Sequence, residues 1–207
     1  MADVHVVALT RADVDAVVTI HARAFPDSAI TAFGPDAIRR YYLWLLEGPH
    51  DAELTGAWLG SELVGFCAAG VFRGAMNGFL RSNRRFLALH IVTHPWLALS
   101  PLIRDRVRTA LKITFRYRQS RTRREPPAAV PSFGVLSIAT NPDVRGSGAG
   151  RALMLDAESR ARAAGHRRMT LTVHPENARA VKFYEQLGWT RASDADEWSG
   201  AMDRVLG

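Results

Sequence analysis

The sequence predicts an α/β (α+β) fold in which a β-sheet is flanked by helices. Strand-type and helix-type segments alternate along most of the 207 residues. Two apolar runs at 53–59 and 63–71 flank a short glycine-containing turn, which is typical of a β-hairpin. A β-type run at 134–140 leads through a glycine-rich loop into a long helical pattern.

The elements before the hairpin are one strand and two helices. Residues 4–8 form a short β-type run, and Thr10 followed by Asp13 resembles a helix capping box. The helix that follows carries apolar side chains at helical spacing and is expected to stop near 25–26, where a proline occurs. A second helix is expected within 34–49, where a glycine-proline pair stands at each end.

The stretch 72–131, between the hairpin and the next strand, is expected to be a helical insert. Its parts 79–91 and 96–115 have helical patterns rich in arginine and large apolar side chains. The part 116–127 is polar and cationic and ends in two prolines, so we expect a loop there.

The C-terminal part continues the alternation of strands and helices, with Gly165 and Gly188 ending the two helices. The expected segments are a strand at 134–140, a helix at 148–164, a strand at 168–173, a helix at 176–187, and closing strands at 189–192 and 198–205.

The composition is that of a globular chain, which we treat as a single domain spanning 1–207. Apolar types make up 47% and charged types 23%, which argues against disorder. The formal net charge of +7 raises nucleic acid, anionic membrane or an acidic ligand as a partner. Only Lys112 and Lys182 are lysines among the 27 basic residues, and GC-rich coding explains such an arginine skew equally well.

Cysteine content and targeting signals suggest a reduced, cytoplasmic protein without a metal. The single cysteine, Cys67, cannot form an intrachain disulfide or a cysteine-rich zinc site, and its apolar surroundings predict a buried, inert thiol. The first residues lack the pattern of a signal peptide, and no stretch of about 18 apolar residues predicts a membrane span.

The glycine-rich loop at 145–150 is the most informative motif. It fits the pattern Arg/Gln-x-x-Gly-x-Gly/Ala, and it lies where a helix N-terminus favours anions. A Walker loop is excluded because Arg151, not lysine, follows Gly150. A dinucleotide fingerprint fits poorly, because Arg151 or Leu153 stands where that pattern needs glycine or alanine.

A second motif lies on the predicted helix at 176–187. Asn177, Ala180 and Tyr184 are spaced i, i+3 and i+7, so they share one helix face. The small residue between an amide and a phenol leaves room for a slim ligand. The alternative is that Tyr184 packs in the core with its hydroxyl bonded locally.

The two blocks within 134–190 together resemble the Gcn5-related (GNAT) N-acetyltransferase superfamily, as does the order of the N-terminal elements. The resemblance implies a central mixed, mostly antiparallel twisted sheet flanked by helices, with an enlarged helical insert between the third and fourth strands. It also implies that 134–190 binds acetyl-CoA, the acyl donor of an N-acetyltransferase. Whether the acyl group is acetyl or longer stays open.

The family's roles carry over to particular positions of this chain. Tyr184 is expected to be the general acid that protonates the leaving thiolate, and Asn177 is expected to bond the pantetheine chain. The edge of the strand before the loop would pair with that chain, and the loop would hold the pyrophosphate. The cofactor-binding residues expected on this basis are Ile138, Ala139, Thr140, Arg145, Gly146, Ser147, Gly148, Ala149, Gly150, Arg151, Asn177, Ala180 and Tyr184.

The general base is not evident from the sequence. Many relatives use a glutamate on the strand corresponding to 135–140, which here contains none; apart from the terminal Thr140, Ser137 is the only hydroxyl inside that strand. Two possibilities remain open: a base from elsewhere in the chain, or transfer without a base. The candidates from elsewhere are His21, Asp27, His90 and His94, whereas His174 is expected to be only a polar residue at a strand end.

The acceptor amine is expected to be small and anionic, for example an amino sugar nucleotide. Arg73, Arg81, Arg84 and Arg85 would form a cationic wall, or else only a solvated helix face. The alternatives are a protein or peptide N-acetyltransferase, and a module whose arginine-rich tract 104–124 binds membrane or nucleic acid. We expect no nucleic acid as partner, leave peripheral membrane contact open, and expect a monomer or homodimer.

Overall fold

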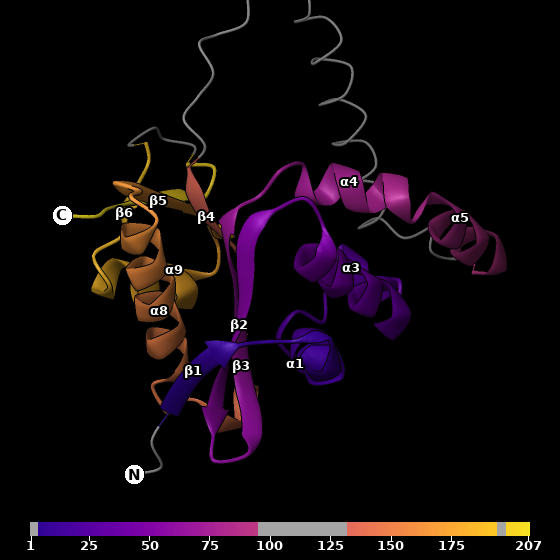
Figure 1. Cartoon of the computed structure of the whole chain (residues 1–207), viewed down its shortest axis with the longest axis horizontal. Coiled ribbons are helices and arrows are strands. Elements are labelled where there is room, and N and C mark those ends of the chain that lie inside the picture. Colours follow the sequence, from indigo (N-terminus) through magenta and orange to yellow (C-terminus); the bar gives the residue numbers. More distant parts are fainter. Residues whose placement is uncertain (1–3, 95–131, 194–197) are drawn as a thin grey trace, which may run out of the picture.

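The computed structural model describes residues 4–94, 132–193 and 198–207 (Figure 1). Within these ranges, seven strands form one sheet in the order β1-β2-β3-β4-β5-β7-β6. Only β4 and β5 run parallel, and the other neighbouring pairs are antiparallel. The strands are β1 (Val4–Ala8), β2 (Asp51–Leu59), β3 (Glu62–Val71), β4 (Phe133–Thr140), β5 (Arg168–Thr172), β6 (Thr190–Arg191) and β7 (Ala201–Val205).

Helices cover both faces of the sheet, with α8 and α9 on one face and α1 and α3 on the other (Figure 1). No described helix is long and apolar enough to cross a membrane. The helices are α1 (Val14–Ala24), α2 (Ala29–Ala32), α3 (Pro35–Glu47), α4 (Ala75–Ser82), α5 (Arg84–Thr93), α8 (Ala149–Ala163) and α9 (Ala178–Gln186), with 3-10 turns η1 (Arg11–Asp13) and η2 (Pro142–Val144).

Each face of the sheet has its own apolar cluster, which fixes the helices above it. The α8 cluster includes Cys67 of β3, Val135 of β4, Leu153 of α8 and Tyr184 of α9. The α1 cluster includes Val17 of α1, Tyr42 of α3, Phe66 of β3 and Ala139 of β4. Because β3 contributes to both clusters by strand alternation, it is buried along almost its whole length.

The predicted fold class is confirmed: the sheet is mixed, mostly antiparallel and flanked by helices. The hairpin is confirmed as β2 and β3. The helix expected at 79–91 is instead two helices, because Asn83 leaves helical geometry and its side chain donates to the Phe79 carbonyl at 3.1 Å. The helix expected at 96–115, the loop at 116–127 and the arginine-rich tract 104–124 lie outside the described residues.

Several predicted element ends also differ in the structure. The helix expected at 176–187 begins at Ala178, since Asn177 caps its first turn. The closing strands expected at 189–192 and 198–205 are shorter, with pairing limited to Thr190–Arg191 and Ala201–Val205. Asp13 accepts a hydrogen bond from the Thr10 N–H at 2.8 Å, but the turn it opens is 3-10 before α1 begins.

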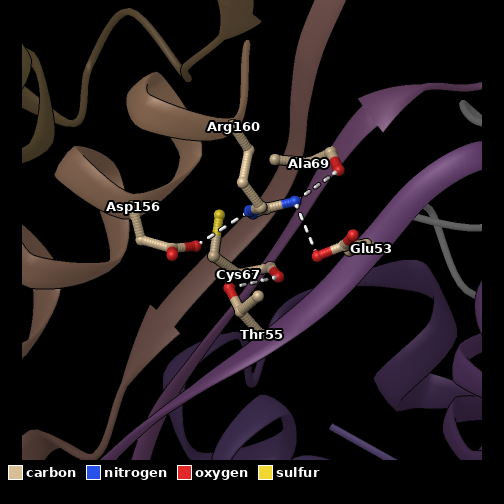
Figure 2. Close-up of polar contacts among 6 residues, drawn as sticks. All are labelled: Glu53, Thr55, Cys67, Ala69, Asp156 and Arg160. Atoms are coloured by element: carbon tan, nitrogen blue, oxygen red, sulfur yellow. Dashed lines mark hydrogen bonds and ion pairs between the residues drawn. The ribbon is translucent and has the colours of Figure 1, made fainter. Parts of the chain in front are cut away.

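Arg160 of α8 links this helix to the β2–β3 hairpin through polar contacts (Figure 2). Its guanidinium contacts Asp156 at 2.9 Å, Glu53 at 3.5 Å and the Ala69 carbonyl at 3.4 Å. Cys67 lies beside it, fully buried, and burial raises the pKa of that thiol to about 12. The prediction of a buried thiol is confirmed, and its reactivity is suppressed because the thiolate is disfavoured.

The sheet opens between β4 and β5. Their parallel pairing is confined to Phe133–Val135 against Met169–Leu171. From Leu136 to Thr140, the edge of β4 that faces away from β3 has no partner among the described strands. This stretch therefore presents backbone N–H and C=O groups that a ligand can pair with.

A β-bulge occurs at the point where the pairing ends. Ser137 pairs with Ala68 and Val135 with Ala69, so Leu136 is an extra residue in β4. Strict alternation would place Val135, Ser137 and Ala139 on one face. Instead Val135 packs in the α8 cluster, whereas Ala139 packs in the α1 cluster. The bulge thus changes which face the second half of β4 presents to each set of helices.

Candidate active site

The glycine loop between β4 and α8 forms an open cradle. Gly146 and Gly148 have φ of 84° and 85°, a left-handed conformation that L-residues with side chains rarely adopt. A Cβ built on either glycine would have nothing within 4 Å. The loop therefore keeps a space in front of the helix that side chains do not fill.

That space faces the start of α8, where the backbone favours an anion. Gly148 is the N-cap residue and has no side chain to satisfy the first-turn N–H groups. The N–H groups of Gly150 and Arg151 lie in that turn and add to the positive end of the helix dipole. Arg145 and Arg151 are exposed on either side of the glycines. The residues present fit a phosphate or pyrophosphate.

The glycine loop, the end of β4 and helix α9 converge. A Cβ on Gly150 would meet the Phe183 ring at 3.5 Å and the Thr140 methyl at 3.7 Å. The strand leads into the loop through Asn141, whose N–H donates to the Val64 carbonyl at 2.7 Å. Three parts that the sequence assigns to one ligand therefore lie together in the structure.

The β4 residues of the predicted site contribute mainly backbone. Ala139 is buried in the α1 cluster, so its side chain faces away from the opening of the sheet. Ile138 is half-buried against the α8 cluster, and Thr140 is half-buried at the strand end. Their backbone groups lie on the edge that β5 leaves unpaired.

Asn177 has a structural task in addition to its predicted one. Its Oδ1 accepts a hydrogen bond from the Ala180 N–H at 3.1 Å, which caps α9. Only the amide Nδ2 remains to donate to a ligand. Ala180 is half-buried and packs against the α8 cluster, and the role of both residues toward a pantetheine chain stays a prediction.

Tyr184 combines a buried ring with an uncommitted hydroxyl. The ring is 8% exposed and lies 5.3 Å from the Phe183 ring and 6.2 Å from the Trp189 ring, centre to centre. Its hydroxyl makes no hydrogen bond to any other described residue. Burial raises the pKa of Tyr184 to about 12, so the phenol keeps its proton at neutral pH.

A buried chain of polar side chains lies on the α1 side of β4, and no short-range sequence pattern predicts it. His21 Nδ1 lies 2.7 Å from the Tyr42 hydroxyl, and that hydroxyl lies 3.2 Å from Ser137 Oγ. His21 Nε2 lies 3.3 Å from Ser28 Oγ. Burial lowers the pKa of His21 to about 4 and raises the pKa of Tyr42. In the sequence, Tyr42 fits an apolar helix stripe. The sequence therefore indicates only His21 and Ser137 as candidates, and it does not connect them.

The other candidate bases lie outside the hydrogen-bonded chain that reaches β4. Asp27 is exposed between α1 and α2, and His174 is exposed after β5. His90 lies on α5 between the Phe33 and Phe86 rings, each 5.7 Å away, and His94 stacks on it at 4.2 Å. His21 is the candidate that the structure connects to the strand.

The predicted cationic wall lies near the start of β4 rather than near its end. Arg81, Arg84 and Arg85 line, with Ser82, an open hollow of about 510 Å³ where α4 meets α5. These helices follow the Gly70 end of β3, which pairs with Gly134, whereas the glycine loop follows Thr140. None of the three arginines forms an ion pair with a carboxylate in the described part of the chain.

The described ranges contain no group of three or more His, Cys, Asp or Glu residues arranged to hold a metal ion.

A family model matches the part of the chain that contains this arrangement. Residues 113–189 match the model described as the acetyltransferase (GNAT) family, a range that includes β4, the glycine loop, α8, β5 and α9. The part of the chain from β4 to α9 is therefore similar to GNAT acetyltransferases. No curated protein sequence matches the chain significantly.

Solved structures of other proteins share the fold of this chain. The PaiA N-acetyltransferase of Thermoplasma acidophilum in complex with coenzyme A is 13% identical, over 98% of this chain and 99% of that one, with a TM-score of 0.59. The ribosomal-protein-S18-alanine N-acetyltransferase of Escherichia coli is 16% identical, over 99% and 95%, with a TM-score of 0.57. YncA of Salmonella typhimurium with acetyl-CoA, a putative acetyltransferase by its description, is 17% identical, over 99% and 94%, with a TM-score of 0.52.

Proposed function

We propose that this chain is an acetyl-CoA-dependent N-acetyltransferase that acetylates the primary amine of a small, anionic acceptor by direct attack on the thioester. The observation that carries the proposal is the open cradle formed by Gly146 and Gly148 beside the unpaired edge of β4. The similar structures from T. acidophilum and S. typhimurium, which contain coenzyme A and acetyl-CoA, support this choice of acyl donor.

The residues of the cradle and of β4 would hold the donor at two places. The first-turn N–H groups of α8, with Arg145 and Arg151, would bind its pyrophosphate. The backbone of Ile138 and Thr140 would pair with the extended pantetheine arm as an added strand does. The bound molecule supplies an activated acetyl thioester, and the chain supplies position, donors and a proton.

Tyr184 is the proposed general acid. Its pKa of about 12 keeps the phenol protonated at neutral pH, and its hydroxyl is not committed to another described group. A proton held there can be given to the sulfur that leaves. A backbone N–H on the open edge of β4 can meanwhile donate to the carbonyl oxygen of the thioester, where negative charge develops.

The preference for an anionic acceptor is supported by the arginine hollow. Arg81, Arg84 and Arg85 are exposed and have no carboxylate partner among the described residues, so they are available to a phosphate group of the acceptor. Replacing all three with glutamine should raise KM for a phosphorylated amine and leave KM for the matching unphosphorylated amine unchanged. Equal effects on both amines would remove the anionic part of the proposal.

The activity is tested by thiol release from acetyl-CoA with four acceptors. These are glucosamine 6-phosphate, a UDP-linked amino sugar, a hexapeptide beginning with alanine, and spermidine. Turnover of one or both anionic sugars, confirmed by mass spectrometry of the N-acetylated product, is the expected result. Turnover of the peptide alone would favour the protein N-acetyltransferase alternative. The absence of turnover together with the absence of acetyl-CoA binding would overturn the proposal.

A further inference from the structure

The hydrogen-bonded chain from β4 to α1 has a fixed direction, which follows from counting protons. Thr31 Oγ1 donates to the Phe25 carbonyl at 2.8 Å, so its single proton is used there. Thr31 Oγ1 also lies 2.7 Å from Ser28 Oγ, and in that contact it can only accept. Ser28 Oγ must therefore donate to Thr31.

The same counting fixes the tautomer of His21. Because the Ser28 proton is used, Ser28 Oγ accepts both from the Thr31 N–H at 3.1 Å and from His21 Nε2 at 3.3 Å. His21 Nε2 thus carries the proton. In a neutral imidazole, Nδ1 is then an acceptor, and it can accept only from the Tyr42 hydroxyl at 2.7 Å.

The hydrogen bond between Tyr42 and Ser137 of β4 is assigned in the same way. The Tyr42 proton is directed to His21, so the Tyr42 hydroxyl can only accept from Ser137 Oγ at 3.2 Å. Ser137 therefore spends its single proton on Tyr42 and is left with acceptor lone pairs alone. A hydroxyl that elsewhere could rotate and donate is held here as a hydrogen-bond acceptor.

The position of Ser137 places its hydrogen-bond-accepting oxygen near the proposed site of reaction. It is the first residue after the bulge, it is half-buried, and it belongs to the stretch of β4 that β5 leaves unpaired. It contacts the α1 side of the sheet through Tyr42, whereas Tyr184 packs in the α8 cluster on the other side. A thioester bound in the opening would thus have Tyr184 on one side and Ser137 on the other.

We propose that Ser137 Oγ accepts a hydrogen bond from the attacking amine and orients its lone pair, and that Tyr42 and His21 are positioning residues that keep Ser137 in this role. This inference rests on the proposed function, because it assigns a residue for the acceptor amine in the same reaction. It requires an acceptor that presents an N–H group, which a primary amine does. No covalent bond forms between the acceptor and the protein.

The direction of the chain is tested first, on the protein alone. A long-range ¹H–¹⁵N correlation spectrum of the imidazoles should show His21 as the neutral Nε2–H tautomer from about pH 5.5 to 8. In the Tyr42→Phe variant the Nδ1 resonance should move, since its donor is lost. A neutral Nδ1–H tautomer in the parent protein would reverse the chain and overturn the proposal.

The role of Ser137 is tested by kinetics with glucosamine 6-phosphate, or with whichever of the four acceptors the parent turns over fastest. The loss of one hydrogen bond in Ser137→Ala should raise KM for the amine about tenfold and leave KM for acetyl-CoA within a factor of about two. Ser132→Ala, a change of the same kind just before β4, is the matched control and should leave both values unchanged. Parent-like amine KM in Ser137→Ala would overturn the proposal.

A double variant separates positioning from simple support of the core. Tyr42→Phe should raise the amine KM in the same direction as Ser137→Ala, and the double variant should be no worse than Ser137→Ala. Additive effects, or an equal rise in KM for acetyl-CoA, would mean that Tyr42 only supports the fold. Thermal melting of each variant identifies any loss of folding. Absence of turnover by the parent would instead defeat the proposed function itself.

Discussion

Each face of the sheet has a buried tyrosine in its apolar cluster, Tyr184 on the α8 side and Tyr42 on the α1 side, and the two differ in what their hydroxyls do. Tyr184, on the α8 side, has no hydrogen-bond partner among the described residues. Tyr42, on the α1 side, is bonded to both His21 and Ser137. Burial raises the pKa of both phenols, so burial alone does not separate them. Their hydrogen-bond partners separate them. The Tyr184 hydroxyl has no described partner, whereas the Tyr42 hydroxyl is bonded to His21 and to Ser137.

The largest expected effect tests the uncommitted hydroxyl. Tyr184→Phe should lower kcat about a thousandfold, within the range of general acid catalysis, while the Kd for coenzyme A stays nearly unchanged. Tyr41→Phe is the matched control, because Tyr41 is also buried and burial also raises its pKa to about 12, but it lies in the α1 cluster. Equal loss of kcat in both variants would refute the acid role of Tyr184.

The free energy of unfolding should depend on pH through His21, which lies on the α1 side of the sheet. Its pKa is about 4 in the folded protein and 6.5 in the unfolded chain, so the unfolded chain binds more protons between these values. The free energy of unfolding should therefore hold above pH 6.5 and fall by on the order of 3 kcal/mol as pH drops to 4.

Urea unfolding at a series of pH values measures this dependence. In His21→Gln the part of the slope between pH 4 and 6.5 that comes from this group should be missing. In His5→Gln, which alters an exposed residue of β1, that slope should remain. A slope in His21→Gln that matches the parent would contradict the assignment.

A loss of coenzyme A binding at the glycine loop can be distinguished from the strain that a side chain causes at any glycine with positive φ. Gly148→Ala should weaken coenzyme A binding about tenfold, because its Cβ enters the space proposed for the pyrophosphate. Gly165→Ala, beyond the other end of α8, has a similar φ of 78° and the same open surroundings. Both variants should lose about 1 kcal/mol of stability, but calorimetry should show weaker binding only for Gly148→Ala.

The smallest expected effect concerns an exposed link between the α1 side and the turn before the loop. Arg23 and Asp143 form an ion pair at 2.6 Å, with both side chains about half or more exposed. Arg23→Gln should change the free energy of unfolding by less than about 0.5 kcal/mol, since water and salt screen such pairs. A loss of stability well above that in thermal melting would show that this pair anchors η2.

Much of the fold and half of the site could be predicted from local sequence. The hairpin, the glycine loop and helix α9 have short-range patterns, so the positions of Gly146, Gly148 and Tyr184 relative to their elements were predictable. The Asn83 break between α4 and α5 was not, because asparagine inside an apolar helical pattern gives only a weak signal against continuation.

The other half of the site depends on long-range register. Tyr42 and Ser137 are 95 residues apart, and the contact between them depends on the bulge that pairs Ser137 with Ala68. Nothing in the β4 sequence shows which residue is extra. Tyr42 also fits its helix stripe as an ordinary core residue, so its hydroxyl gave no reason to connect it with a serine on a distant strand.

The extra residue in β4 makes one strand behave as two half-strands of opposite phase. The first half, with Val135, follows the needs of the apolar packing beneath α8. The second half, with Ser137 and Ala139, faces the helices α1 and α3. If Leu136 were paired like the other residues of β4, so that no residue was extra, Ser137 would share the phase of Val135, setting a hydroxyl among apolar side chains and leaving Tyr42 without its donor. The bulge, and not only the composition of β4, therefore decides which face of the sheet receives the Ser137 hydroxyl.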